Sequence, residues 1–478
     1  MTVSIWQAEG REPIREVDVL VVGAGLAGCA AAMFLHQAGH EDDVAVTEMR
    51  DVALGASGRN AGFMITGLDL YYHHAVEKYG ADVTREVYAL SERTHAIWRG
   101  LIDKHGVRFN GIGSMLLAES DAEADELRKA YAAMQAEGIS AIFHDGDPLG
   151  RGYCAAIEQP QDGAVQPVEL ARAALTESEA EPDRQQRNLQ HRADRPGKVI
   201  VQTRKYTFHA RKVLLATNAY SVSLHPYFAG KIIPTRAQVM ITAPLAKPAL
   251  NTCGYSDYGF MYYRMTFDNR LLIGGGRKLY KDLENDTLED RVTTPVQSYI
   301  DAYMARRFPD VKAPVERRWA GIMGFTPDGL PLVGALPDAP DVVFCAGFNG
   351  HGLALAAAAA ERAVNLLLHG THAGAFSPRP PDPQTLRSCL RRVSGYCLHI
   401  SDLIPGRGHG EGSRAQQDGG VRSRTKAGGQ DDPIRGASRV KVVGAFSSPG
   451  TRRAGVVLLR PGSEPTARRR VYNRDTIE

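Results

Sequence analysis

Three glycines and a glutamate near the start of the chain have the types and the spacing to hold a dinucleotide. Gly23, Gly25 and Gly28 form a GxGxxG pattern, and Glu48 follows Gly28 by 20 positions. In such a pattern the first glycine allows a tight turn, the second leaves room for a pyrophosphate, and the third lets a helix pack closely on a strand. The acidic residue can accept hydrogen bonds from a ribose. Ala24 lies inside the same turn.

The segments around these residues predict the elements that would position them. Residues 17–22 predict a buried strand, residues 29–38 predict a helix, and residues 44–47 predict a second strand that ends at Glu48. The N-terminus of the helix would present free N–H groups and a partial positive charge to the phosphates. A glycine pattern alone is a weak signal, and the alternative is a glycine turn in an α/β fold that binds nothing. The flanking elements and Glu48 favour binding.

A second loop of small residues follows at positions 55–62, with the sequence GASGRNAG. It contains Ser57, Arg59 and Asn60, and its small residues let the backbone approach a ligand closely. The alternative is an ordinary flexible loop, but the position just after a dinucleotide pattern favours ligand binding.

The composition of the chain argues against several classes of protein. Its 478 residues suffice for two or three domains, and a net charge of +3 gives no case for a nucleic-acid or membrane partner. The six cysteines form no CxxC pair, which fits the reducing cytoplasm. The first 16 residues have charges of both signs and no apolar core, so we expect no signal peptide. No apolar run reaches about 18 residues, so we also expect no membrane span. His74 and Glu77 are spaced to share a metal, but no third ligand stands out, and we predict no metal site.

Later segments predict a second, mixed region. Residues 81–105 and 121–137 have apolar positions at helical spacing. The region 231–310 is typical of an antiparallel sheet, with strands predicted at 237–242, 261–265 and 270–276.

Two further segments end in residues that suit a ligand. The apolar strand predicted at 211–219 ends in small and polar residues that include Asn218, as do strands whose carboxyl ends face a ligand. The segment 347–352, GFNGHG, opens the last clear helix and is a second glycine-rich helix N-terminus able to stabilise negative charge. A plain glycine turn before a packed helix is an equal alternative for this segment alone.

Two other segments lose all pattern. Residues 177–197 are almost entirely polar and show neither a strand face nor a helix face, and the sequence from 377 onward is rich in Arg, Gly, Ser and Pro. We expect the second to be largely disordered. Both are also typical of translation out of frame. Translating the coding DNA in its other frames tests that hypothesis, and finding no better pattern there contradicts it.

Taken together, several motifs resemble those of FAD-dependent amine and amino-acid oxidoreductases of the D-amino-acid oxidase superfamily. They are GAGLAG with Glu48, GASGRNAG, LLATNAY, RLLIGGGR, GFTPDGLPLVG and GFNGHG, in this order. The resemblance covers about residues 14–375, with a gap at 177–197.

The resemblance implies an α/β fold: a discontinuous Rossmann-like FAD-binding domain with an α+β substrate domain that contains an antiparallel sheet. The expected FAD-binding domain comprises residues 14–80, 148–230 and 315–376. The expected substrate or cap domain comprises residues 81–147 and 231–314, and residues 377–478 form the irregular tail.

The resemblance also assigns expected roles to residues. The cofactor, FAD, would be bound by residues from each of the segments above. These are Gly23, Ala24, Gly25, Gly28, Glu48, Ser57, Arg59, Asn60, Asn218, Gly347, Asn349, Gly350 and Gly352. The expected catalytic residues are Tyr263, Arg264 and His351, with Tyr262 also on the substrate side. For Tyr262 and Tyr263, core packing is an equal alternative.

The chemistry implied is hydride transfer from the carbon beside a substrate nitrogen to the flavin, followed by hydrolysis of the imine. The partners are then a small amine and oxygen or another electron acceptor. Two positions depart from relatives: Met323 stands where some have an arginine for the substrate carboxylate, and Gly321 stands where others have a flavin-linked cysteine. We therefore expect a larger amine, or a carboxylate held elsewhere, and non-covalent FAD. The alternatives are a non-catalytic or damaged flavoprotein-like chain and an NAD-dependent dehydrogenase.

Overall fold

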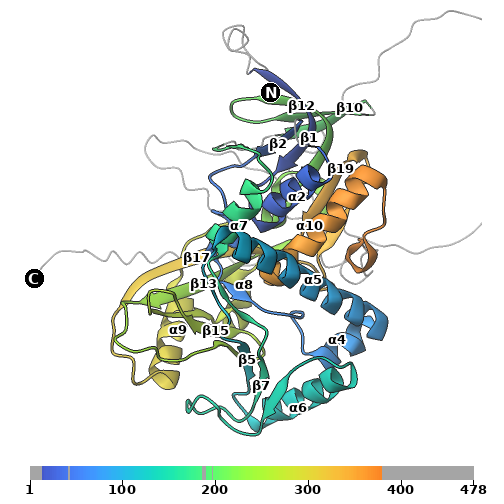
Figure 1. Cartoon of the computed structure of the whole chain (residues 1–478). Helices are drawn as coiled ribbons and strands as arrows, with labels where there is room; N and C mark the ends of the chain where they lie inside the picture. Colours follow the sequence, from blue (N-terminus) through green and yellow to red (C-terminus); the bar gives the residue numbers. More distant parts are fainter. Residues whose placement is uncertain (1–12, 41–42, 186–189, 196, 379–478) are drawn as a thin grey trace, which may run out of the picture. The chain divides into compact units, whose positions relative to one another are not determined.

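The structure is a computed structural model that describes residues 13–40, 43–185, 190–195 and 197–378 (Figure 1). The predicted tail therefore lies, from residue 379 onward, outside the described residues. None of the described helices has both the length and the apolar character needed to cross a bilayer. The division into two domains stays a prediction, and the sheets are described here one by one.

A largely parallel sheet is built around β1 (Ile14–Val22). β1 runs parallel to β12 (Thr207–Leu215) on one side and to β2 (Val44–Thr47) on the other, and β12 also pairs with β19 (Ala339–Ala346). The last four residues of β1, from Val19 onward, are all buried, as expected for a strand covered on both faces. The predicted strand–turn–helix–strand order is therefore confirmed, with the first helix, α2, at Leu26–Gln37.

The polar segment 177–197 contributes edge strands to this sheet, although its pattern predicts none. β9 (Pro182–Asp183) pairs with β2, and β10 (Gln190–Arg195) pairs with β11 (Lys198–Gln202). They end the sheet on opposite sides, in the order β10-β11-β12-β1-β2-β9. Backbone pairing at an edge needs no apolar face, which is why the side-chain pattern misses these strands.

A second sheet of eight strands is antiparallel except for the pair β14 and β5, so the antiparallel sheet expected over 231–310 is confirmed. Its strands are, in spatial order, β17 (Val315–Phe325), β13 (Ile233–Thr242), β16 (Leu271–Gly275), β15 (Met261–Met265), β14 (Cys253–Ser256), β5 (Ser114–Leu117), β7 (Ala156–Gln159) and β6 (Ile142–His144). A small third sheet contains β3 (Phe63–Met64), β8 (Gly163–Val165) and β4 (Phe109–Asn110). The remaining strand, β18 (Leu332–Leu336), pairs with β19.

α10 (Gly352–His369) packs against α2 and against α5 (Ala81–His105), and α2 and α10 also contact the first sheet (Figure 1). Residues 356–360 of α10 are five buried alanines, whose small side chains allow close helix contact. The fully buried Trp98 of α5 donates its indole N–H to the Leu353 carbonyl at 2.9 Å. α5 thus fixes the first turn of α10.

The other helices are short or lie outside this bundle. They are α3 (Ala56–Arg59), α4 (Tyr72–Tyr79), α6 (Asp121–Ala136), α7 (Pro167–Thr176), α8 (Lys281–Glu284) and α9 (Thr294–Arg307). The helices predicted at 81–105 and 121–137 are confirmed as α5 and α6.

A buried carboxyl group links the first loop after β3 to the second sheet. Asp162 is 1% exposed and accepts hydrogen bonds from the Ser114 hydroxyl at 2.5 Å, the Thr66 amide at 3.0 Å and the Thr66 hydroxyl at 3.1 Å. Burial raises the pKa of Asp162 to about 7, even though these donors act in the opposite direction.

We predict that this carboxyl group makes the fold less stable as the pH rises. Between about pH 4 and 7 the folded state keeps the Asp162 proton and the unfolded state loses it, so the free energy of unfolding falls with pH. Asp162→Asn removes this titration. Denaturant unfolding of the native protein and of the variant across this range should show that the difference between their free energies of unfolding changes with pH. The opposite contribution of His95, whose pKa burial lowers to about 4, is present in both and cancels. If the two free energies of unfolding instead change with pH in parallel, the prediction is wrong.

Candidate functional site

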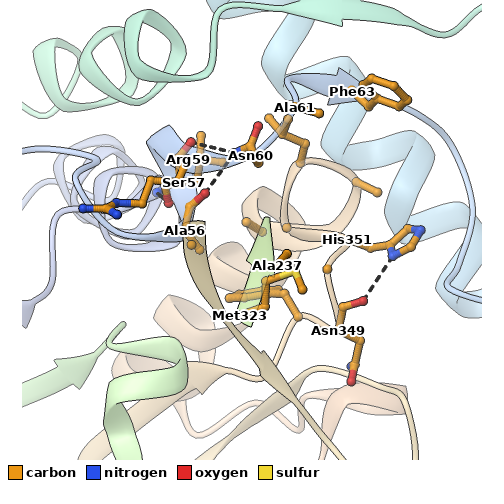
Figure 2. Close-up of a pocket in the computed structure, with 18 of the residues that line it drawn as sticks. Ala56, Ser57, Arg59, Asn60, Ala61, Phe63, Ala237, Met323, Asn349 and His351 are labelled. Atoms are coloured by element: carbon orange, nitrogen blue, oxygen red, sulfur yellow. Dashed lines mark hydrogen bonds between the residues drawn. The ribbon is translucent and has the colours of Figure 1, made fainter. Parts of the chain in front are cut away.

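A cavity of about 160 Å³ brings the predicted binding segments together. Its walls come from the glycine turn before α2, from α3, from the end of β12, from the start of α10, and from β13 to β17 of the second sheet. Figure 2 shows Ser57, Arg59 and Asn60 on one side of it, with Asn349 and His351 on the other. The predicted residues on its wall are Gly25, Ser57, Arg59, Asn60, Asn218, Asn349, Gly350, His351 and Gly352.

The glycine turn meets the cavity through Gly25, the residue before the first turn of α2, and through Leu26 and Ala27. Gly23 has φ +104°, a conformation that favours glycine, and a Cβ there would lie 2.7 Å from the Ala216 carbonyl oxygen. Gly28 faces the strand and not the cavity, because its ideal Cβ would lie only 1.8 Å from the carbonyl oxygen of Gly23. Gly23 thus allows the tight turn and Gly28 allows the close packing, which are the two roles that the sequence predicted for them.

Glu48 lies just after β2, beside the glycine turn. One carboxylate oxygen accepts the Ala24 amide at 2.9 Å, and the other accepts the Arg50 amide at 2.9 Å. The side chain is thus held next to the turn, although it does not line the cavity. Its contact with a ribose stays a prediction.

The side chains of the 55–62 loop mainly fix the loop itself. The Ser57 hydroxyl accepts the Leu26 amide at 2.9 Å, which ties this loop to the first turn of α2. Asn60 donates to the Ser57 carbonyl at 2.6 Å (Figure 2). Arg59 donates to the Ala320 carbonyl at 2.8 Å and pairs with Asp290 at 2.9 Å. The loop therefore presents a rigid small-residue surface, as the ligand-binding interpretation requires.

The 347–352 segment is held by two asparagine side chains. Asn218 accepts the Gly347 amide at 2.9 Å, and the buried Asn349 accepts the Thr326 amide at 2.8 Å. β12 ends at Leu215, earlier than predicted, because Asn218 has φ +45° and begins a short 3-10 turn, η1 (Asn218–Ser223). Both asparagines thus position the loop, a role that the sequence did not assign to them.

Two helix N-termini consequently face one cavity. α2 begins beside Gly25, and α10 begins at Gly352 after His351. Each N-terminus carries a partial positive charge, so the cavity can stabilise negative charge at two separate places. A dinucleotide with a pyrophosphate and a ring that becomes negatively charged on reduction fits this arrangement.

Of the predicted catalytic residues, only His351 lines the cavity. Tyr263 is fully buried on the opposite face of β15 from Tyr262, because side chains alternate along a strand. Arg264 is 4% exposed, and its guanidinium donates to the carbonyls of Ala61 and Met265. Tyr262 thus lines the cavity, whereas Tyr263 packs in the core and Arg264 binds backbone carbonyls, so neither of these two predicted catalytic residues reaches the cavity.

Three polar or charged side chains of the cavity wall were not predicted from the sequence: Asp69, Tyr255 and Arg277. Asp69 lies 3.9 Å from Nδ1 of His351. Arg277 directly follows the glycines of the predicted strand 270–276, and a cation at that place was a usable signal. Asp69 and Tyr255 carried no such signal, because only the tertiary fold brings them to the site.

A histidine cluster stands apart from this cavity. Glu126 accepts a hydrogen bond from His73 at 2.9 Å and lies equally close to Nε2 of His74. Glu126 is therefore the third group that the sequence did not reveal. Together with His73 and His74 it forms the single trio with metal-ligand spacing within the described ranges. Glu77 is not part of it. Lys129 also pairs with Glu126, so an ion-pair network accounts for the cluster.

Comparison with known proteins gives concordant matches. Residues 18–366 match the family described as FAD dependent oxidoreductase. The chain is 27% identical over 357 residues to gamma-glutamylputrescine oxidoreductase of Escherichia coli (strain K12), covering 70% of this chain and 80% of that protein. It is 26% identical over 357 residues to glycine oxidase of Geobacillus kaustophilus (strain HTA426), covering 71% and 89%.

Two solved structures share the fold. The crystal structure of glycine oxidase from Geobacillus kaustophilus aligns with a TM-score of 0.65 and 22% identity, covering 77% of this chain and 100% of that one. L-proline dehydrogenase from P. horikoshii aligns with a TM-score of 0.63 and 23% identity, covering 75% and 95%.

Proposed function

The chain belongs to the FAD dependent oxidoreductase family, and from this premise we propose that it oxidises a C–N bond in an amine or amino-acid-like substrate. The observation that carries the proposal is the continuity of one cavity. The glycine turn, the two helix N-termini and the aromatic side chains of the second sheet all line it, together with the charged side chains of Asp69 and Arg277. The E. coli relative is an oxidoreductase named for an amine, which agrees with this class of substrate.

The residues that would hold FAD are the glycine turn with Glu48, the 55–62 loop, and the 347–352 segment. FAD, when bound, supplies the hydride acceptor. Gly321 lines the cavity and offers no side chain for a covalent link, and the four described cysteines lie elsewhere. An NAD-dependent dehydrogenase would leave the second helix N-terminus without a role.

Aromatic rings line the part of the cavity where we place the substrate. Phe63 packs edge-on against Tyr255 with ring centroids 4.8 Å apart, and Tyr262 lies 6.1 Å from Tyr255. A dry aromatic wall disfavours the charged form of an amine, and the neutral amine is the form that can be oxidised. Asp69 is the carboxylate on this wall and would attract the incoming ammonium.

The remaining partners follow from the same proposal. Oxygen or another electron acceptor would reoxidise the cofactor, and neither a nucleic acid nor a membrane takes part. We place the chain in the cytoplasm because Cys29, Cys253 and Cys345 are buried free thiols among the residues that the structure describes.

Purified protein tests this function directly. We predict that it is yellow, that acid precipitation releases all of its flavin into the supernatant, and that some amines bleach the flavin without oxygen. Release on denaturation follows from a cavity wall with Gly321 in place of a linking side chain. A colourless protein that takes up no added FAD would instead support a non-catalytic chain. Flavin that stays in the precipitate would contradict non-covalent binding.

A further inference from the structure

A second cavity, of about 330 Å³, adjoins the first. The rest of its wall comes from the segment 66–71, from α4, α5 and α6, and from β5 and β7. α4 packs against α5 and α6, and α6 also contacts β7 (Figure 1). A ligand in the first cavity can therefore extend into the space between these elements. The residues that line both cavities are Ile65, Asp69, Tyr255, Gly259 and His351.

Tyrosine rings form much of the wall of the second cavity. They belong to Tyr71, Tyr72, Tyr88, Tyr255 and Tyr258. Tyr71 stacks on Tyr258 with ring centroids 5.6 Å apart, and Tyr72 packs edge-on against Tyr88 at 5.7 Å. Aromatic side chains that pack on one another in this way offer a large apolar surface to a ligand.

The wall of the second cavity carries little charge. Of the described residues that line it, none is a lysine or an arginine. His74 belongs to the part that the first cavity does not share, and it already pairs with Glu126 at 2.9 Å. Burial raises the pKa of the Tyr88 hydroxyl, and the carboxylates of Asp162 and Glu92 act in the same direction, so this hydroxyl stays neutral. A charged group placed here would lose its water without gaining a partner of opposite charge.

The second cavity also has the volume for a sizeable group. An apolar cavity of roughly 150 Å³ is already large enough to bind benzene. The first cavity, of about 160 Å³, must also receive part of the cofactor. The second cavity is therefore the larger space for a substrate, and it suits an aromatic ring or a chain of several carbons.

We propose that the second cavity binds the side arm of the substrate, and that this arm is an elongated alkyl or arylalkyl group without a charge. The nitrogen and the carbon to be oxidised would lie beside Asp69 and His351, which line both cavities, and the arm would extend toward Tyr72 and Tyr88. This inference rests on the proposed function and adds to it the substrate class.

A series of amines of increasing length tests the inference on the FAD-loaded protein. Under anaerobic conditions, the dependence of the bleaching rate on amine concentration gives an apparent Kd for each amine. From ethylamine to hexylamine, each methylene group that enters the cavity should tighten binding by about fourfold. 3-Phenylpropylamine should bind at least as tightly as hexylamine. 1,5-Diaminopentane has the length of hexylamine but ends in a second ammonium group, and it should bind more weakly by about tenfold or more.

A variant of the cavity wall sharpens the test. Ala130 is a 1% exposed residue of α6 that lines the second cavity but not the first. The added carbons of Ala130→Leu would occupy space needed by the arm, so hexylamine binding should weaken by about tenfold more than ethylamine binding. Ala132→Leu is the matched control, because Ala132 is an exposed residue of the same helix and lines neither cavity. It should leave the apparent Kd of both amines within about twofold of the native value.

The outcomes separate this inference from the proposed function. Bleaching with an apparent Kd that is independent of arm length, or with equally tight binding of hexylamine and 1,5-diaminopentane, overturns the inference and leaves the proposed function standing. Equal weakening of both amines in Ala130→Leu does the same. The series on the native protein remains decisive if this variant does not fold. An FAD-loaded protein that none of these amines bleaches overturns the inference, and one that no amine at all bleaches overturns both.

Discussion

Replacing Gly25 with alanine will weaken FAD binding by about 10- to 100-fold, the effect expected when one methyl group intrudes on a close contact. Gly25 precedes α2 and lines the cavity, at the place where the turn is predicted to meet the pyrophosphate. Its φ of −84° is accessible to alanine, so backbone strain is not the cause. The new Cβ would lie 2.7 Å from the Ser57 hydroxyl oxygen, which is a second possible source of the effect.

A double variant separates these two sources. Ser57→Ala removes the hydroxyl, and alone it should cost about 1 kcal/mol of stability through the lost hydrogen bond from Leu26. In Gly25→Ala/Ser57→Ala the clash within the protein is relieved, but the methyl group still occupies the phosphate position. FAD titration followed by flavin fluorescence should therefore show no recovery of affinity. Recovery to the affinity of Ser57→Ala would contradict a direct contact between Gly25 and FAD.

Gly100→Ala is the matched control for this experiment. Gly100 is an exposed residue of α5, and no atom lies within 4 Å of its ideal Cβ. Alanine there should raise helix stability slightly and leave FAD binding unchanged.

The parts of the site that the sequence predicted correctly are those with a local cause. The glycine turn, α2 and β2 follow one another within 40 residues, and each residue type has a role that depends on its own backbone. The start of α10 was predictable for the same reason, since glycines before an apolar helix mark an N-terminus wherever it lies in the fold.

The parts that it could not predict depend on which face of an element the fold covers. The alternation of β15 shows that Tyr262 and Tyr263 point in opposite directions, but it does not say which direction meets the cofactor. Asn218 and Asn349 are correctly placed near the site, yet their side chains are used to hold Gly347 and Thr326. A polar residue beside a ligand loop can serve the loop instead of the ligand, and only tertiary contacts distinguish the two.

The charged side chains of the cavity illustrate the same limit. Asp69 comes from the segment between β3 and α4, and Arg277 comes from the turn after β16, so more than 200 residues separate them. Nothing in either segment points to the other. Both line the cavity, which therefore has side chains of both charges on its surface.

Replacing Tyr263 with alanine will unfold much of the protein at moderate denaturant concentrations, with a loss of about 3–5 kcal/mol in the free energy of unfolding. Tyr263 is 0% exposed, and its ring lies 5.2 Å from that of Phe308 and 6.0 Å from that of Tyr303. Its hydroxyl donates to Tyr153 at 2.5 Å. Alanine would leave a cavity in this core and remove one of the two hydrogen bonds of the Tyr153 hydroxyl, which keeps its bond with Tyr303 at 2.9 Å.

Substitution of the neighbouring Tyr262 should have the opposite effect, with a small loss of stability and a large loss of flavin reduction. Tyr262 lines the cavity, and an ideal Cβ on Gly274 would meet its ring at 2.2 Å, so the ring lies flat across that glycine at the edge of the core. Tyr262→Ala should cost only about 1 kcal/mol in stability, as for a typical point variant, but should slow flavin reduction by amines by about tenfold or more. Denaturant unfolding and anaerobic stopped-flow reduction on the two variants measure both quantities. If Tyr263→Ala instead keeps its stability and loses only reduction, the assignment of Tyr263 to the core is wrong and the residue belongs to the active site.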